Sequence, residues 1–187
     1  NMNALNMLNT KYIIVEQDGE VVPMLNEERL GNAWFVDEII PVETPNQESD
    51  MLRVIDPASV AVVDRKFSDF VTDSKTPADT SAHIELSSYA PDVLTYQSNC
   101  AFDKTAVFSE IYYGPNKGWQ AYIDGVKVPH FRADYALRAM KVPQGDHEIK
   151  FRFEPKSYKI GEMLSLIFSI LIILILIFGL YKWLTKA

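Results

Sequence analysis

Residues Met163–Leu180 read MLSLIFSILIILILIFGL, a run of eighteen residues without one formal charge near the end of the chain. At about 1.5 Å rise per residue, a helix over this run is about 27 Å long, close to the hydrocarbon thickness of a bilayer. Tyr158 and Lys159 precede it, and Tyr181 and Lys182 follow it, as is usual for a helix that meets both membrane interfaces. A buried core helix is the alternative, but such helices usually carry a polar stripe or are shorter. We therefore expect a transmembrane helix.

The sidedness of this helix does not follow from charge. Few basic residues follow the run and four closely precede it, so a simple count would place the preceding domain in the cytoplasm. Long folded domains translocate largely regardless of charge, however, so the orientation stays open at this point. The four basic residues before the run can contact lipid phosphates or a phosphorylated glycolipid. Alternatively, they are ordinary solvated residues at strand edges. The four membrane-proximal basic residues are Lys150, Arg152, Lys156 and Lys159.

Composition excludes several functional classes. Residues 1–100 hold 6 basic against 17 acidic residues, whereas residues 101–161 hold 10 against 7. No basic run interleaved with aromatic residues indicates nucleic-acid binding. The single Cys100 allows no intrachain disulfide. His83, His130 and His147 lie far apart in the sequence, and none has a second His or Cys at ligand spacing, so no metal site is predicted.

Catalytic motifs are also lacking. The sequence has no nucleophile elbow and no glycine-rich phosphate loop before a helix, since Gly114–Gly118 joins two predicted strands. We therefore predict no catalytic residue and no cofactor within these residues.

Residues 81–160 show the most regular pattern, with short strand-like runs between turn signals. Asp124-Gly125, between two runs of β-forming residues, is the strongest hairpin signal in the chain. Regular short strands joined in this way indicate an antiparallel β-sandwich of the jelly-roll or immunoglobulin-like kind. The seven predicted strands are 82–87, 93–98, 105–112, 119–123, 126–131, 135–142 and 147–153.

Residues 1–80 are less regular and predict a small α+β subdomain. We expect helices at 4–9 and 48–55, and the polar, proline-containing segment 68–80 is the best candidate for a boundary. The expected strands are 11–15, 21–23, one unbroken strand over 32–42, and 59–63. The predicted fold is therefore mainly β. Its parts in order are 1–80 (α+β), 81–160 (sandwich), 161–184 (transmembrane helix) and 185–187 (short tail).

One group of aromatic and charged side chains falls within twenty residues of consecutive predicted hairpins. Aromatic rings stack on the CH groups of sugars while Asp and Arg pair with hydroxyls, so such a group is typical of a sugar-binding surface. The alternative is that Trp119 and Tyr122 belong to the core and that Asp134 pairs with Arg138 at a strand end. The six predicted glycan-facing residues are Trp119, Tyr122, Asp124, Arg132, Tyr135 and Arg138.

Four segments together resemble the C-terminal region of the YfhO family of bacterial membrane proteins. They are Ser109–Gly125 (SEIYYGPNKGWQAYIDG), Arg132–Arg138 (RADYALR) and Val142–Phe151 (VPQGDHEIKF), and near the start Leu5–Ile14 (LNMLNTKYII). The last of these is similar to a family segment that follows earlier membrane spans. The resemblance covers most of the chain, is weak over 43–80, and depends on the ordered series rather than on any single motif.

Some residues can be interpreted within this resemblance. Trp119, Tyr122, Tyr135 and Arg138 match family positions that either hold the sandwich together or face an acceptor glycan. The turn-making residues are Pro115, Gly118, Asp124, Gly125 and Gly145.

The resemblance implies a polytopic protein of the bacterial cytoplasmic membrane, related to the GT-C glycosyltransferases. Such proteins take a sugar from a polyprenyl-phosphate carrier outside the membrane and attach it to an envelope polymer, and characterised Gram-positive members glycosylate lipoteichoic acid. Their catalytic acidic residue is expected in an early extracytoplasmic loop outside these 187 residues. Residues 1–160 would lie outside the membrane and 182–187 in the cytoplasm. The implied partners are the bilayer, upstream transmembrane helices of a longer parent chain, and a polyprenyl-phosphate sugar or an envelope glycan.

Two further hypotheses remain at this stage. One is a non-enzymatic envelope module, anchored by a single helix, that binds a protein or a carbohydrate. The other is a tail-anchored cytoplasmic protein. Gly161, Ser165 and Ser169 recur every four residues and would let another helix approach closely, which favours the last helix of a bundle over a lone anchor.

Overall fold

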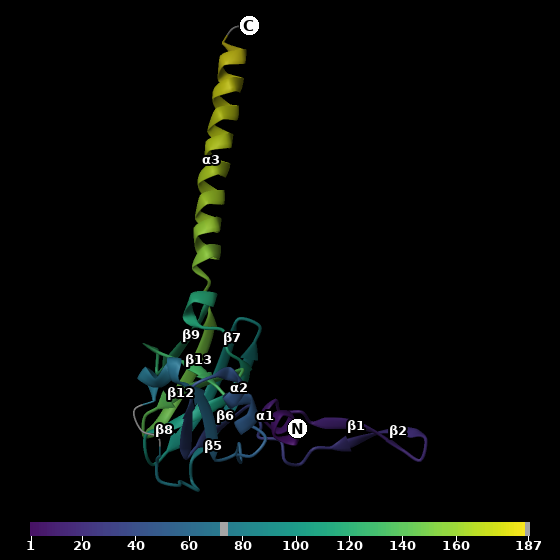
Figure 1. Cartoon of the computed structure of the whole chain (residues 1–187). Coiled ribbons are helices and arrows are strands. Elements are labelled where there is room, and N and C mark those ends of the chain that lie inside the picture. Colours follow the sequence, from purple (N-terminus) through teal and green to yellow (C-terminus); the bar gives the residue numbers. More distant parts are fainter. Residues whose placement is uncertain (72–74, 186–187) are drawn as a thin grey trace. The chain divides into compact units, whose positions relative to one another are not determined.

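The computed structural model describes residues 1–71 and 75–185, and it divides the chain into two compact units, Asn1–Phe153 and Glu154–Ala187. Figure 1 shows that the first unit is built mainly of strands and the second is one long helix. This confirms the predicted mainly β fold with antiparallel sheets, a small helical N-terminal part and one C-terminal apolar helix.

One layer of the first unit is a five-stranded antiparallel sheet in the order β10-β9-β13-β7-β6. The predicted hairpin at Asp124-Gly125 is confirmed: both residues have positive φ, and Ile123 pairs with Val126 across the turn. The strands are β6 (His83–Ala90), β7 (Val93–Cys100), β9 (Trp119–Ile123), β10 (Val126–Val128) and β13 (Gly145–Phe153).

The second layer is a four-stranded antiparallel sheet in the order β11-β12-β8-β3. The prediction of one strand over 126–131 was wrong, because β10 and β11 lie in different sheets and Pro129 between them has no N–H for a ladder. The strands are β3 (Ala33–Val36), β8 (Lys104–Ile111), β11 (Phe131–Ala133) and β12 (Leu137–Val142), and a 3-10 turn η2 (Pro115–Lys117) precedes β9.

A third layer covers the outer face of the four-stranded sheet. It contains the parallel pair β4 (Glu38–Val42) and β5 (Val60–Asp64), with α1 (Met2–Met7), α2 (Pro45–Met51) and the 3-10 helix η1 (Arg65–Phe70). The single strand predicted over 32–42 was wrong, because the chain changes layers at Asp37. The N–H groups of Asp37 and Glu38 both donate to the Ser59 carbonyl, at 2.8 and 3.1 Å, and Lys104 pairs with the Asp37 carboxylate.

Helix α2 begins earlier than the sequence prediction placed it. Thr44 caps the helix by accepting a hydrogen bond from the Gln47 N–H, and Pro45 occupies the first turn. Both residues are typical of a helix N-terminus. The helix therefore starts at Pro45 and ends at Met51 rather than spanning 48–55.

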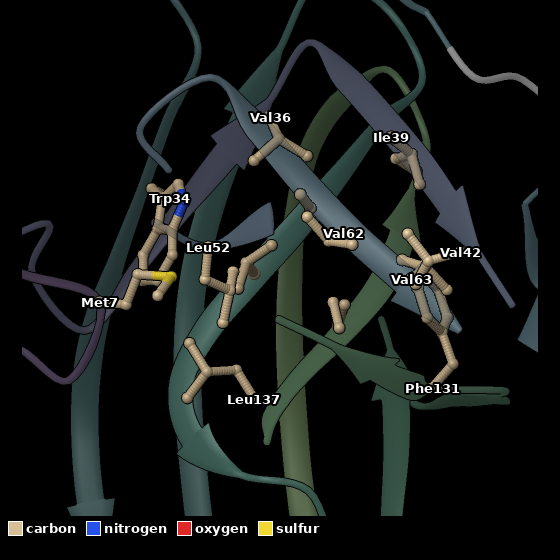
Figure 2. Close-up of a cluster of buried hydrophobic side chains, with 14 residues drawn as sticks. Met7, Trp34, Val36, Ile39, Val42, Leu52, Val62, Val63, Phe131 and Leu137 are labelled. Carbon is tan, nitrogen blue, oxygen red and sulfur yellow. The ribbon is translucent and has the colours of Figure 1, made fainter. Parts of the chain in front are cut away.

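The four-stranded sheet lies between two hydrophobic cores, because alternate residues of its strands point to opposite faces. Val107 points into the core shared with β4, β5 and the helices. Figure 2 shows this core, with Val36, Val62 and Leu137 among its side chains. Phe108 points into the core shared with the five-stranded sheet. The domain boundary predicted near residue 80 stays a prediction. The structure does show that β3, which precedes this boundary, pairs with β8, which follows it, within the central sheet.

A two-stranded ribbon, β1 (Tyr12–Gln17) and β2 (Glu20–Leu25), is paired only with itself within the described residues. Figure 1 shows it extending away from the sheets of its unit.

The second unit contains α3 (Lys156–Leu184), with 29 residues and an apolar window of mean hydropathy 3.1. At about 1.5 Å per residue it is about 43 Å long, which exceeds a hydrocarbon core and leaves its polar ends for the interfaces. Within the described residues it is the one helix long and apolar enough to cross a membrane.

Candidate functional site

Trp119 and Arg138 meet in the interior between the two sheets. The guanidinium carbon of Arg138 lies 4.6 Å from the ring centroid of Trp119 and 4.5 Å from that of Phe151. Arg138 is 1% exposed, and its Nη2 donates to the Ile111 carbonyl at 3.4 Å. The ring of Trp119 is tilted against Phe153 at 5.5 Å. These two residues therefore make packing contacts, and their glycan-facing role stays a prediction.

Tyr122 lies on the other face of the five-stranded sheet, since its neighbours Ala121 and Ile123 are in the core. Lys127 of β10 and Lys150 of β13 are its direct cross-strand partners. Directly opposite residues in a sheet have Cβ atoms about 5 Å apart. Both lysines therefore flank the tyrosine.

Arg152 completes the group from the same strand as Lys150. Its guanidinium carbon lies 5.5 Å from the ring centroid of Tyr122. We call this group of three cations around one aromatic ring the basic–aromatic face; its residues are Tyr122, Lys127, Lys150 and Arg152. Such a set can hold a phosphate group beside a sugar ring.

Asp124 lies at the hairpin turn beside this face and bonds to β13. Its carboxylate accepts a hydrogen bond from the Glu148 N–H at 2.9 Å and lies 2.6 Å from His147 Nδ1. The hydrogen bond to His147 holds the pKa of Asp124 below its ordinary value and raises the pKa of His147. Glu148 is in turn paired with Lys150. Asp124 therefore fixes the turn and connects to the basic–aromatic face through β13.

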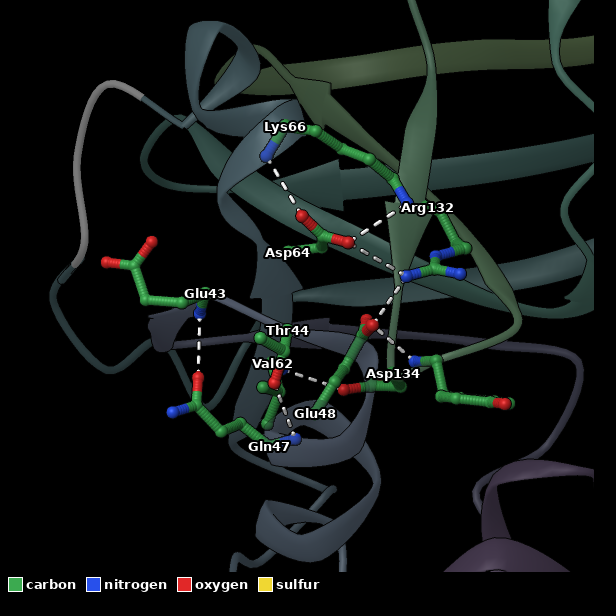
Figure 3. A network of polar contacts seen from close by, with 10 residues as sticks. Glu43, Thr44, Gln47, Glu48, Val62, Asp64, Lys66, Arg132 and Asp134 are labelled. Atoms are coloured by element: carbon green, nitrogen blue, oxygen red, sulfur yellow. Dashed lines mark hydrogen bonds and ion pairs between the residues drawn. The ribbon is translucent and has the colours of Figure 1, made fainter.

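Arg132 and Tyr135 are brought together elsewhere, in the third layer, by a glutamate that the sequence analysis did not single out. Glu48 on α2 is fully buried, accepts from Arg132 Nη2 at 2.6 Å and accepts from the Tyr135 N–H at 2.8 Å (Figure 3). Arg132 also reaches Asp64 at 3.5 Å, and Lys66 pairs with Asp64 at 2.9 Å. Burial raises the pKa of Glu48, whereas the Lys66 N–H lowers that of Asp64.

Asp134 holds the turn that presents Tyr135. Asp134 and Tyr135 have positive backbone φ angles, 50° and 69°, which residues other than glycine rarely adopt. Asp134 Oδ1 accepts from the Val62 N–H at 2.8 Å, while its Oδ2 is buried and has no hydrogen-bond partner in the described structure. Burial raises the pKa of this carboxyl to about 7. This network therefore fastens α2 and β5 to the β11–β12 turn, and its visible role is structural.

Replacing Asp134 by asparagine is expected to stabilise the fold in a pH-dependent way. Because the folded pKa is about 7 against an ordinary 3.8, the native state keeps a proton between these pH values that the unfolded state has lost. Native stability therefore falls as pH rises from about 4 to about 7. Asparagine removes this ionisation, with a gain on the order of 4 kcal/mol at pH 8 and little gain at pH 4. Urea unfolding of the detergent-solubilised chain, followed by tryptophan fluorescence, measures the difference.

Asp69→Asn, at an exposed aspartate of η1, is the matched control for this substitution and should change little at either pH. An equal effect of Asp134→Asn at pH 4 and pH 8 would contradict the assigned protonation.

The sequence did not single out Lys127 of the basic–aromatic face or Glu48 of the network with Arg132, for different reasons. Lys127 could have been found, because a two-residue turn at Asp124-Gly125 fixes the pairing of Lys127 with Tyr122. Glu48 could not, because it lies 84 residues from Arg132 and no local pattern joins them.

The small residues predicted for helix packing lie on one side of α3. Gly161, Ser165 and Ser169 line a shallow groove together with Tyr158 and Glu162 of the same helix. Apart from the adjoining backbone of its own helix, a Cβ added at Gly161 would meet nothing within 4 Å. The surface is open for a neighbouring helix, and such packing stays a prediction.

The remaining predictions concern the membrane-proximal cations and metal ions. Lys156 is exposed at the first position of α3, whereas the side chain of Lys159 and residues 186–187 lie outside the described residues. Across residues 1–71 and 75–185, no group of three His, Cys, Asp or Glu residues could hold a metal ion.

The comparison with known families identifies the chain. A family model described as "Bacterial membrane protein YfhO" matches residues 67–165, from η1 through the five-stranded sheet into α3. No curated protein and no solved structure was found to match. The match covers more than half of the chain, includes three of the four resembling segments and agrees with the apolar helix at the C-terminal end. The chain therefore belongs to the YfhO family of bacterial membrane proteins.

Proposed function

We propose that residues 1–160 lie outside the bacterial cytoplasmic membrane and serve a YfhO-type protein that transfers sugar to the cell envelope. The donor would be a polyprenyl-phosphate sugar and the acceptor an envelope glycopolymer or lipid. In this proposal the described chain is non-catalytic, and its sandwich binds or orients the acceptor. Family membership and the membrane helix support this reading.

The observation that carries the proposal is the basic–aromatic face. On a sheet face turned away from the core, Arg152 lies 5.5 Å from the Tyr122 ring centroid, and Lys127 and Lys150 are the cross-strand partners of Tyr122. Envelope glycopolymers and lipid-linked sugars place phosphates next to sugar rings. Cations pair with the phosphates and an aromatic ring packs on sugar CH groups, so the face has the chemistry that such a ligand requires.

The groove on α3 supports the second half of the proposal, in which this helix packs against upstream transmembrane helices of a longer parent chain. Ser165 and Ser169 line it with Gly161, and small residues let two helix backbones approach closely in a bilayer. A sandwich held in this way would stay beside the catalytic spans.

The test is binding of a glycerol-phosphate oligomer to the full chain in nanodiscs, measured by calorimetry at about 0.1 M salt. The double variant Lys150→Ala/Arg152→Ala removes two charge-assisted contacts and is expected to weaken binding about tenfold or more. The matched control is Arg65→Ala/Lys75→Ala. It removes the same net charge from exposed cations paired with Glu43 and Glu38.

Equal weakening by both double variants would show non-specific attraction and would contradict a site on the basic–aromatic face.

Sidedness is tested in cells with Ser88→Cys, which places a thiol on an exposed position of β6 while Cys100 is buried. Labelling by a membrane-impermeant maleimide only after permeabilisation would place the sandwich in the cytoplasm and overturn the proposal.

A non-enzymatic envelope module that binds another protein is the second candidate function. The observation that favours it is the β1–β2 ribbon, whose apolar side chains lie outside both hydrophobic cores.

A further inference from the structure

The β1–β2 ribbon exposes apolar side chains on both of its faces. Ile14 is 73% exposed on one face, and Met24, the partner of Ile13, is 50% exposed on the other. The register places Tyr12, Ile14, Pro23 and Leu25 on one face. An isolated two-stranded hairpin is only marginally stable in water. The exposed apolar side chains and the small size of this ribbon therefore indicate that a further strand pairs with it.

The two edges of the ribbon are not equivalent. The Asn26 N–H donates to the Lys11 carbonyl at 2.9 Å, so the odd-numbered residues of β1 direct their backbone groups toward β2. The N–H and C=O groups of Tyr12, Ile14 and Glu16 must then point outward. On the other strand the outward position opposite Ile14 is Pro23, which has no N–H.

A proline in the middle of an edge strand prevents further pairing, and β2 is closed in this way. The edge of β1 has no such residue and contains three consecutive β-branched residues, Ile13, Ile14 and Val15. Within residues 1–71 and 75–185, the free hydrogen-bonding edge of the ribbon is therefore that of β1.

We propose that β1 pairs with β1 of a second copy of this chain, antiparallel and centred on Ile14. A twofold axis perpendicular to the sheet joins residues of the same parity, so Ile14 faces the partner's Ile14 and Tyr12 faces the partner's Glu16. These three positions are the ones whose backbone groups point outward. The product is a four-stranded antiparallel sheet.

Charge in this register is complementary. Glu16 faces the hydroxyl-bearing side chain of the partner's Tyr12, and no carboxylate stands directly opposite another. Lys11 faces the partner's Gln17, which is itself paired with Glu20 at the tip of the ribbon. Lys11, the partner's Gln17 and the partner's Glu20 are therefore neighbours across three adjacent strands, which places each lysine near an acidic residue of the other ribbon.

The membrane compensates for the small area of such an interface. Two copies held in one bilayer by α3 meet at a high effective concentration, so a short strand pairing suffices for association. This inference does not depend on glycan binding.

The first test is disulfide formation by Ile14→Cys in the full chain in proteoliposomes, after mild oxidation and a non-reducing gel. In the proposed register the two Cα atoms are about 5.5 Å apart, within reach of a disulfide. The matched control is Val21→Cys, nearly as exposed but on β2. Its two copies are separated by three strand spacings, at least about 14 Å, so it should not cross-link. Equal cross-linking of both variants would overturn the proposal.

The second test removes the outward N–H alone. Ile14→Pro copies on β1 what Pro23 does on β2 and leaves the hydrogen bonds within the ribbon in place, so we expect a folded but monomeric chain. Ile14→Val keeps the N–H and should remain dimeric. Single-molecule photobleaching in proteoliposomes gives the oligomeric state, and tryptophan fluorescence checks folding. A dimer that persists in Ile14→Pro, or a monomeric unmodified chain, would refute β1 pairing.

Discussion

Replacing Phe151 by alanine is expected to lower the free energy of unfolding by about 3–5 kcal/mol, because it removes a fully buried aromatic side chain. Phe151 is fully buried, and its ring centroid lies 4.9 Å from that of Phe108 and 6.2 Å from that of Tyr96. It also stacks on the Arg138 guanidinium at 4.5 Å. The substitution thus opens a cavity and removes the stacking partner of a buried cation. Urea unfolding of the detergent-solubilised chain measures the loss.

Phe153→Ala provides the control on the same strand and the same face. Phe153 is 44% exposed and contacts the ring of Trp119, so its truncation removes less buried area and should cost clearly less. If the two substitutions had similar effects, the aromatic contacts around Phe151 would not be the main support of this core.

Glu48→Ala is expected to destabilise the chain by about 3 kcal/mol, because it takes the nearest carboxylate from the partly buried Arg132 and leaves only Asp64, at 3.5 Å. The glutamate is fully buried and accepts hydrogen bonds from Arg132 at 2.6 Å and from the Tyr135 N–H at 2.8 Å. Its loss also removes the group that fixes the strained turn at Asp134 and Tyr135. The free energy of unfolding is again the measured quantity.

Glu43→Ala is the matched surface control. Its pair with Arg65 joins two side chains that are both more than half exposed, and such pairs contribute about 0–1 kcal/mol. In a double-mutant cycle, Arg132→Ala should cost much less in the Glu48→Ala background than alone, since the two residues share one interaction. Strict additivity would show that the buried pair is not coupled.

The fold class was predictable because it depends on local patterns. The strand predicted over 147–153 and the hairpin predicted at Asp124-Gly125 are both confirmed by the structure. The errors lie where the chain passes between layers. Asp37 and Pro129 look like minor interruptions of a strand, but at each the chain leaves one sheet and enters another.

The candidate sites were less predictable, because they depend on which side of a sheet or turn a residue occupies. Alternation along β9 already places Trp119 and Tyr122 on opposite faces, but only the packed sheets show that Trp119 contacts Arg138 inside while Tyr122 faces Lys150 outside. Arg132 and Tyr135 are joined through Glu48, which comes from a helix more than eighty residues earlier.

The sequence by itself determined the membrane helix, the turns and the β-rich class, since hydropathy and turn chemistry act within a few residues along the chain. Only the tertiary structure decided that β3 joins the central sheet, that Arg138 is buried between aromatic rings, and that Glu48 neutralises Arg132. The physical reason is that these contacts join residues distant in sequence. They form when whole layers pack, and no local propensity specifies which layers meet.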